Sequence, residues 1–154
     1  MDWDTFCVGL KIYFNRHKWS NTSLEDFIGC MQEGYNEKKP DTPLDLTQWS
    51  QEWLQTKGVN KIAAEVEEAD GKYTKFTLKQ TPCKHADNQF RRQTINISLF
   101  NNDGGLIEKI ERVVIENKEL TEIEVLKGKN VPKAVLLNSD DWGYGYFVPD
   151  DASL

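Results

Sequence analysis

The chain has 154 residues and a formal net charge of −6 at pH 7, and this acidic balance argues against nucleic acid or an anionic membrane as a partner. No apolar run approaches the roughly 20 residues of a membrane span, and the first residues, Met1 to Asp4, lack the basic start and apolar core of a signal peptide. The three cysteines are widely spaced and form no C-x-x-C pair, which is typical of reduced thiols, so we expect a cytoplasmic protein.

Helical periodicity dominates residues 1–57. Residues 4–17 predict a first helix, which carries the following residues on one side: Phe6, Leu10, Tyr13, Phe14 and His17. Thr22 and Glu25 form the capping box expected at the start of a second helix. Its periodic apolar residues are Leu24, Phe27, Ile28, Met31 and Tyr35. Gly34, Asn36 and the segment 38–43 should end this helix.

The stretch 45–60 predicts a third helix at the point where the periodicity changes. Asp45 is a good N-cap, and Gln48 stands where its side chain can reach back to the cap. The apolar stripe of this helix consists of Leu46, Trp49, Trp53 and Leu54. Gly58 can adopt the left-handed conformation that terminates a helix. We expect Leu46 and Trp53 to pack between two lobes, with Trp49 also in a core or inter-lobe position.

After Gly58 the apolar residues alternate with period two, which predicts strands. Asp70-Gly71 and the segment 101–105 mark the turns of two hairpins. The expected strands are Ile62–Val66, Lys75–Lys79, Arg92–Phe100, Leu106–Glu116, Leu120–Leu126, Ala134–Leu137 and Trp142–Tyr146. We therefore predict an α+β chain, with a helical segment at 1–57 and an antiparallel β-sandwich of about seven strands at 58–154.

Several short motifs in this order resemble the aminopeptidase N-like zinc peptidases. The third helix contributes Asp45-Leu46, Trp49, Glu52-Trp53-Leu54 and Gly58-Val59-Asn60. The upstream helices contribute Phe6, Gly9-Leu10, Tyr13-Phe14, Asn21-Thr22 and Asp26-Phe27. The closing segment contributes Val135-Leu136-Leu137-Asn138, Asp140-Asp141 and Tyr144. The resemblance covers nearly the whole chain and implies the end of a catalytic domain followed by the family's small β-sandwich.

The zinc motifs of that family are missing from this sequence. The family holds zinc with an H-E-x-x-H pair and a glutamate on a following helix, and binds the substrate amine with a G-x-M-x-N strand. This chain has only two histidines, His17 and His85, and neither has a second histidine four residues on. No catalytic, cofactor-binding or metal-binding residue of the family therefore transfers to any position here. The resemblance implies zinc for the parent enzyme and no cofactor in this chain.

The remaining polar candidates have simpler interpretations. His17 on an apolar helix face is most simply a packing residue or a partner of the helix dipole. His85 with Cys83 and Asp87 suggests a metal site, but a polar loop is the simpler explanation because the ligand count is short. The acidic residues of the first hairpin are expected to form its solvated face: Glu65, Glu67, Glu68 and Asp70. Trp142, Tyr144 and Tyr146 either cap the core or form a platform that binds sugars.

Two classes of function follow. The resemblance implies a non-catalytic structural fragment that buttresses the catalytic domain of a zinc aminopeptidase and spaces it from a C-terminal helical domain; these two domains are then its partners. The parent would remove N-terminal residues from peptides. The alternative is a self-standing sandwich module that binds carbohydrate through the late aromatic residues. Because the ends at Met1 and Leu154 carry no obvious caps, we expect a cut segment, and its exposed helix faces also predict self-association.

Overall fold

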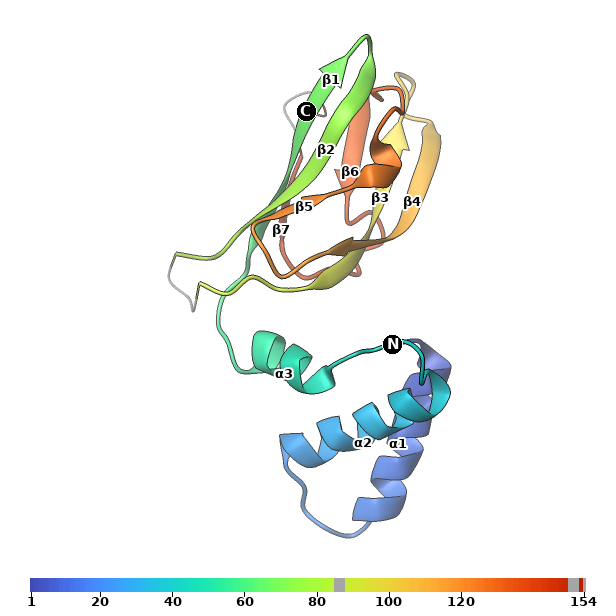
Figure 1. Cartoon of the computed structure of the whole chain (residues 1–154), viewed down its shortest axis with the longest axis vertical. Helices are drawn as coiled ribbons and strands as arrows, with labels where there is room; N and C mark the ends of the chain where they lie inside the picture. The colour runs from blue at the N-terminus through green and yellow to red at the C-terminus, as the bar shows by residue number, and fades with distance from the viewer. Residues whose placement is uncertain (85–87, 150–152, 154) are drawn as a thin grey trace. The chain divides into compact units, whose positions relative to one another are not determined.

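The computed structural model describes residues 1–84, 88–149 and 153. Three helices come first: α1 (Trp3–His17), α2 (Leu24–Lys38) and α3 (Leu46–Leu54). Strands follow: β1 (Lys61–Ala69), β2 (Lys72–Thr81), β3 (Gln93–Phe100), β4 (Leu106–Ile115), β5 (Leu120–Glu122), β6 (Ala134–Leu137) and β7 (Tyr146–Val148), with the 3-10 turn η1 (Glu124–Leu126) after β5 (Figure 1). This order of three helices and seven strands confirms the predicted α+β class.

The chain divides into two compact units, Met1–Gln55 and Thr56–Leu154, which are the helical unit and the sandwich. Each has its own cluster of buried apolar side chains, and none of the buried members is shared. No helix in the described part of the chain is long and apolar enough to cross a bilayer.

Two glycines bring α1 and α2 together in the helical unit. A Cβ atom added to Gly34 would lie 2.5 Å from the backbone nitrogen of Gly9, and one added to Gly9 would lie 2.8 Å from Sδ of Met31. The backbones therefore approach more closely than any other residue type allows. Ile28, Cys30, Met31 and Leu46 form the buried part of the core beside this crossing. The prediction that Gly34 helps to end α2 is wrong, because the helix continues to Lys38.

The N-cap of α2 differs from the predicted one. Ser23 is the N-cap of α2 and forms a reciprocal capping box with Asp26, one residue later than the expected Thr22 and Glu25. Thr22 instead shares a 2.6 Å hydrogen bond with the Tyr13 hydroxyl. Asp2 is the N-cap of α1, and its carboxylate accepts a hydrogen bond of 2.9 Å from the Thr5 backbone.

α3 begins where the sequence predicts and ends early. The Asp45 carboxylate accepts a 2.9 Å hydrogen bond from the backbone of Gln48, which confirms the N-cap. The Gln48 side chain donates to Glu52 at 2.8 Å instead of returning to the cap. The helix stops at Leu54, before Gly58. Of the predicted stripe, Leu46 is buried and Trp53 is half-buried, whereas Trp49 and Leu54 are exposed.

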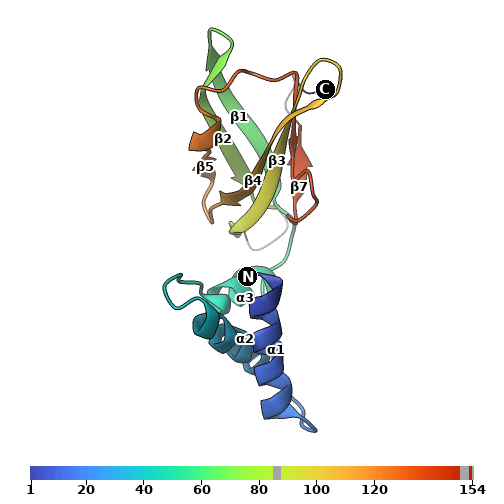
Figure 2. The same cartoon turned by 90° about the vertical axis from the view of Figure 1, so that its right-hand side faces the viewer.

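The sandwich has one sheet with strand order β5-β2-β1-β7 and a second with order β4-β3-β6 (Figures 1 and 2). β1 and β2 form the expected hairpin, with Asp70 and Gly71 both at positive φ as a tight turn of this kind requires. The expectation of a purely antiparallel sandwich is wrong at one edge, because β7 pairs with β1 in parallel. This is possible because β7 is not reached by a hairpin: a long connection from β6 lets the last strand enter in either direction.

The inner faces of the two sheets bury the side chains that the period-two pattern selects. The buried set includes Ile62, Phe76, Leu78, Ile95, Ile97, Leu99, Ile110, Ile115, Leu126 and Leu137. The expected strand 120–126 departs from this pattern, because only Leu120–Glu122 pairs with β2 and the chain then turns into η1. Ile123 stays buried, but Val125 is exposed.

Candidate functional site

The residues that suggested metal binding are not brought together among those the structure describes. His17 lies in the last turn of α1, half-buried, with its ring 5.5 Å from that of Tyr13. This ring contact fits the expected packing role. Cys83 is half-buried in the other unit, while His85 and Asp87 lie outside the described residues. Within residues 1–84, 88–149 and 153, no three His, Cys, Asp or Glu side chains are grouped as metal ligands.

The acidic residues of the first hairpin face solvent, as expected. Glu65 pairs with Lys79 at 2.9 Å, and Glu67 pairs with Lys75 at 3.8 Å, across the β1–β2 register. The hydrogen bond and charge of Glu65 raise the pKa of Lys79 above its ordinary value. These are exposed cross-strand pairs of opposite charge, so they support the hairpin and do not form an acid/base pair.

The late aromatic side chains project into solvent. Trp142, Tyr144 and Tyr146 are 61%, 65% and 66% exposed, so the expectation that they cap the core is wrong. The glycines between them are the residues that face inward: a Cβ on Gly143 would lie 2.6 Å from Ile95. Because the backbone lies so close to the core here, the larger neighbours must point outward. Only residues from Tyr146 onward form a strand, so the expected strand from Trp142 begins late.

A buried polar cluster in the sandwich is the feature that sequence reasoning missed. Arg91, only 4% exposed, donates from its guanidinium to Asn60 Oδ1 at 3.1 Å, to Thr56 Oγ1 at 2.7 Å and to the Lys57 carbonyl at 3.0 Å. The Arg91 backbone nitrogen also donates to Gln80 Oε1 at 2.9 Å. The loop before β3 and the segment that enters β1 are thereby joined through one side chain.

Asn60 and Gln80 complete the hydrogen bonding of this cluster. The Asn60 amide donates to Gln80 Oε1 at 2.6 Å and to the Gln89 carbonyl at 2.7 Å. Gln80 Nε2 donates to the carbonyls of Arg91 and Glu116, both at 3.2 Å. Every polar atom of the two amide side chains has a partner, which favours one fixed arrangement. Gln80 lies two residues after Leu78 and four after Phe76, so the period-two pattern of β2 places it on the buried face and could have revealed it. Arg91 lies in a loop, where no periodic pattern indicates burial.

A second polar cluster lies on the outer side of the three-stranded sheet. Asn96, almost fully buried, donates to the Asp140 carboxylate and accepts a 2.8 Å bond from the Arg112 backbone at a bulge in β4. Lys109 Nζ donates to Asp140 Oδ1 at 2.8 Å. The hydrogen bonds from Lys109 and Asn96 lower the pKa of Asp140 below its ordinary value. The chain after β6 is thereby held against β3, where Ser139 and Ser98 also share a 2.8 Å hydrogen bond.

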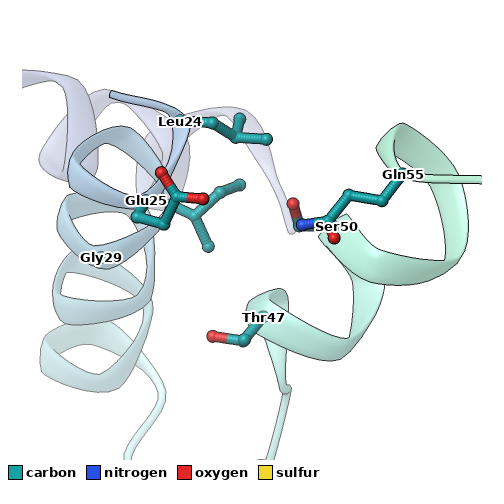
Figure 3. A pocket seen from close by; sticks show the side chains of 7 residues that line it. Leu24, Glu25, Gly29, Thr47, Ser50 and Gln55 are labelled. Carbon is teal, nitrogen blue, oxygen red and sulfur yellow. The ribbon is translucent and has the colours of Figure 1, made fainter. Parts of the chain in front are cut away.

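A small cavity of about 120 Å³ opens between α2 and α3 (Figure 3). Its lining consists of Leu24, Glu25, Ile28 and Gly29 from α2 and of Thr47, Ser50 and Gln55 from α3 and its end. The lining supplies a single carboxylate and no imidazole, amine or thiol, so this cavity can accept a small group but cannot supply an acid/base pair.

Among residues 1–84, 88–149 and 153, the donor side chains do not form a site that fits a catalytic zinc ion. Such a site needs three protein ligands and an open position for water. The sequence supplies two histidines, one of them, His17, packed against Tyr13, and the described residues hold no grouped ligands. The polar clusters around Arg91 and Asp140 instead hold loops and strand ends in place.

The fold and these clusters thus define an α+β chain whose buried polar side chains anchor its own backbone. It is 35% identical over 159 aligned residues to aminopeptidase N of Streptomyces lividans, and the match covers 98% of this chain and 18% of that protein. No protein-family model matches the sequence. The similarity confirms the resemblance to the aminopeptidase N-like proteins that the motifs indicated. The chain spans less than a fifth of the length of this relative.

Proposed function

We propose that this chain is a non-catalytic structural portion of a zinc aminopeptidase, which buttresses the catalytic domain and sets its distance from a C-terminal helical domain. The observation that carries the proposal is the extent of the similarity: nearly all of this chain matches a small part of aminopeptidase N, and the chain lacks H-E-x-x-H and G-x-M-x-N. Its parent would remove N-terminal residues from peptides, and the zinc would belong to the upstream domain.

The exposed apolar side chains of the helical unit support such a role. Trp3, Phe14 and Trp19 are 71%, 62% and 100% exposed, more apolar surface than a small water-soluble unit usually leaves uncovered. In the proposed parent the upstream portion covers part of this surface. The close α1–α2 crossing and the hydrogen-bonded polar clusters of the sandwich are the rigid features that a spacer requires.

A chimeric enzyme tests this function. The matching segment of the Streptomyces lividans aminopeptidase N is replaced by this chain in one variant and deleted in another, and hydrolysis of leucine amide is measured. We expect activity in the replacement and none in the deletion, because the segment completes the packing of the catalytic domain. A replacement that carries Arg91→Ala is the matched control and should lose activity at a lower temperature.

The pure chain provides the complementary measurement. We expect it to contain no stoichiometric zinc after dialysis against a metal buffer, and to hydrolyse no leucine amide, because the donor set does not fit the ion. Bound zinc at one equivalent, together with turnover that a chelator abolishes, would overturn the proposal. An inactive replacement chimera with a normal fold would likewise contradict the buttressing role.

Carbohydrate binding remains a second candidate, favoured by the exposure of Trp142 and Tyr146. Exposed aromatic rings on a fixed backbone can stack against sugar rings. Affinity electrophoresis in gels that contain soluble polysaccharides tests it, with Trp142→Ala as the variant and the exposed Trp19→Ala as the control. Retardation that disappears only in Trp142→Ala supports binding through these rings, and no retardation of the natural chain rejects it.

A further inference from the structure

α1 carries an apolar stripe that lies mostly away from its contact with α2. Trp3, Cys7, Leu10 and Phe14 are spaced four, three and four residues apart, so they lie on one side of the helix. Gly9, which touches Met31 of α2, lies roughly 130° around the helix from this stripe. Trp3, Cys7 and Phe14 are exposed, and Leu10 is half-buried at the margin of the helical core.

The two aromatic ends of the stripe are supported by rings of the core. The Trp3 ring lies 5.7 Å from Phe6, and the Phe14 ring lies 5.4 Å from Tyr13 in an edge-on arrangement. Phe6 and Tyr13 pack against the buried cluster of the helical unit. The exposed rings are therefore oriented before any partner arrives, which lowers the entropic cost of covering them.

Charges along one flank of the stripe change sign along the helix. Asp4 flanks its first half and Lys11, two turns later, flanks its second half, and both side chains are exposed. Within the described part of the chain, neither forms an ion pair. In a parallel pair of identical helices, this flank of one copy would lie on the opposite side of the interface from the same flank of the other, so Asp4 and Lys11 would not meet. An identical helix in antiparallel orientation sets Asp4 beside Lys11 of the second copy, twice by symmetry, and also opposes the helix dipoles.

We propose that the free chain forms an antiparallel dimer with a second copy of itself through this stripe of α1. The two-fold axis passes between Cys7 and Leu10, so that Trp3 packs on Phe14 of the other copy and the small Cys7 packs on its Leu10. Trp3 and Phe14 are about 16 Å apart along the helix at 1.5 Å per residue, so two such helices match end to end. The inference goes beyond the proposed function and does not depend on it.

The size of the stripe predicts a weak dimer. One exposed helix face buries less than the standard 1,200–2,000 Å² of a stable complex, so we expect a dissociation constant on the order of 10 µM. Sedimentation equilibrium of the full chain, over concentrations that bracket this value, measures it directly. Phe14→Asp should weaken association about 100-fold or more, because it places a charge at the apolar end contact. Trp19→Asp is the matched control: this fully exposed aromatic residue follows the helix and lies off the stripe, so the dimer should persist.

A charge exchange tests the orientation. Asp4→Lys and Lys11→Asp should each weaken the dimer by about 5- to 10-fold, and the double variant should recover the natural affinity. Circular dichroism checks that each variant keeps its helices. A chain that stays monomeric at all concentrations, or a dimer that survives Phe14→Asp, would overturn the proposal. Failure of the double exchange to recover affinity would reject the antiparallel arrangement. Neither result bears on the chimeric enzyme, so the two proposals fail separately.

Discussion

Arg91 holds the entry to β1 against the loop that precedes β3. Its guanidinium donates hydrogen bonds to Asn60, Thr56 and the Lys57 carbonyl, all on the segment that leads into β1. Asn60 belongs to the Gly58-Val59-Asn60 motif that carried the family resemblance. In the structure its side chain accepts a hydrogen bond from Arg91 and donates one to Gln80. A buried charge of this kind is tolerated because its guanidinium donates to three acceptors.

Arg91→Ala should destabilise the sandwich by about 3 kcal/mol, because it leaves the buried Asn60 and the part-buried acceptors of Thr56 and Lys57 without this donor. Urea unfolding followed by far-UV circular dichroism measures the loss. The neighbouring Arg92→Ala is the matched control: Arg92 pairs with Glu116 at 3.3 Å on the surface, and its loss should cost roughly 1 kcal/mol or less. Equal effects of the two substitutions would contradict the anchoring role of Arg91.

The lowered pKa of Asp140 predicts that the folded chain loses stability in acid. Its pKa in the folded chain is lowered from 3.8, first by Lys109 and then by Asn96, so its ionised form stabilises the fold. This contribution is fully present above about pH 4 and is lost as the pH falls through the lowered pKa. Asp140→Asn should therefore lower the urea midpoint near neutral pH and flatten its fall below pH 4. Glu111→Gln, an exposed carboxylate on β4, should leave the acid limb of the curve steep.

At the scale of the elements, the helical unit depends on how closely α1 and α2 approach. Glycine is usually unfavourable inside a helix, by about 1 kcal/mol relative to alanine. At Gly34 that cost is offset by the packing that the bare backbone permits, because the nearest atoms belong to the Gly9 backbone and cannot move aside. The same helix contains Gly29, where an added Cβ would meet nothing within 4 Å.

Gly34→Ala should therefore destabilise the helical unit by about 2 kcal/mol, since the two helices must separate to admit a methyl group. Gly29→Ala introduces the same methyl group where no atom lies within 4 Å and should stabilise the unit by up to about 1 kcal/mol. Thermal unfolding monitored at 222 nm compares the two. Opposite signs are the expected result, and a neutral Gly34→Ala would mean that the close crossing is absent in solution.

The edge strands of the sandwich are poor sites for self-association, which is why we assign the dimer contact to α1. An edge strand with free backbone groups can recruit another chain. Here β5 and β7 have three residues each, β4 carries a bulge opposite Asn96, and the β6 nitrogen of Val135 donates to Ser153. Short or interrupted edges make poor templates for pairing, so the sheets contribute little to dimer formation.

For the whole molecule, the contacts of Thr56 and Lys57 with Arg91 determine where the chain can be cut to obtain the sandwich without the helical unit. A fragment of residues 56–154 keeps all three partners of the Arg91 guanidinium on this segment, Thr56, Lys57 and Asn60, whereas a fragment of residues 61–154 loses all three. We expect the first fragment to unfold cooperatively in urea and the second to be less stable by about 3 kcal/mol or more. Equal stability of the two would show that the entry segment is not part of the sandwich fold.

Features that depend on neighbouring residues were predictable from the sequence. The Asp70-Gly71 turn, the Asp45 cap, the three helices and the change from helical to strand periodicity all rest on local geometry, and each agrees with the structure. The resemblance to aminopeptidase N-like proteins was also predictable, because the order of the motifs can be read directly from the sequence.

The tertiary structure decided the features that depend on distant segments. The Gly9–Gly34 contact, the parallel entry of β7 beside β1 and the polar cluster of Arg91 each join parts of the chain whose meeting leaves no periodic signal. The exposure of Trp142 was decided in the same way, since two inward glycines bring the backbone against the core and leave no room for a ring. Local periodicity reports which face of an element is apolar, and only packing determines what covers that face.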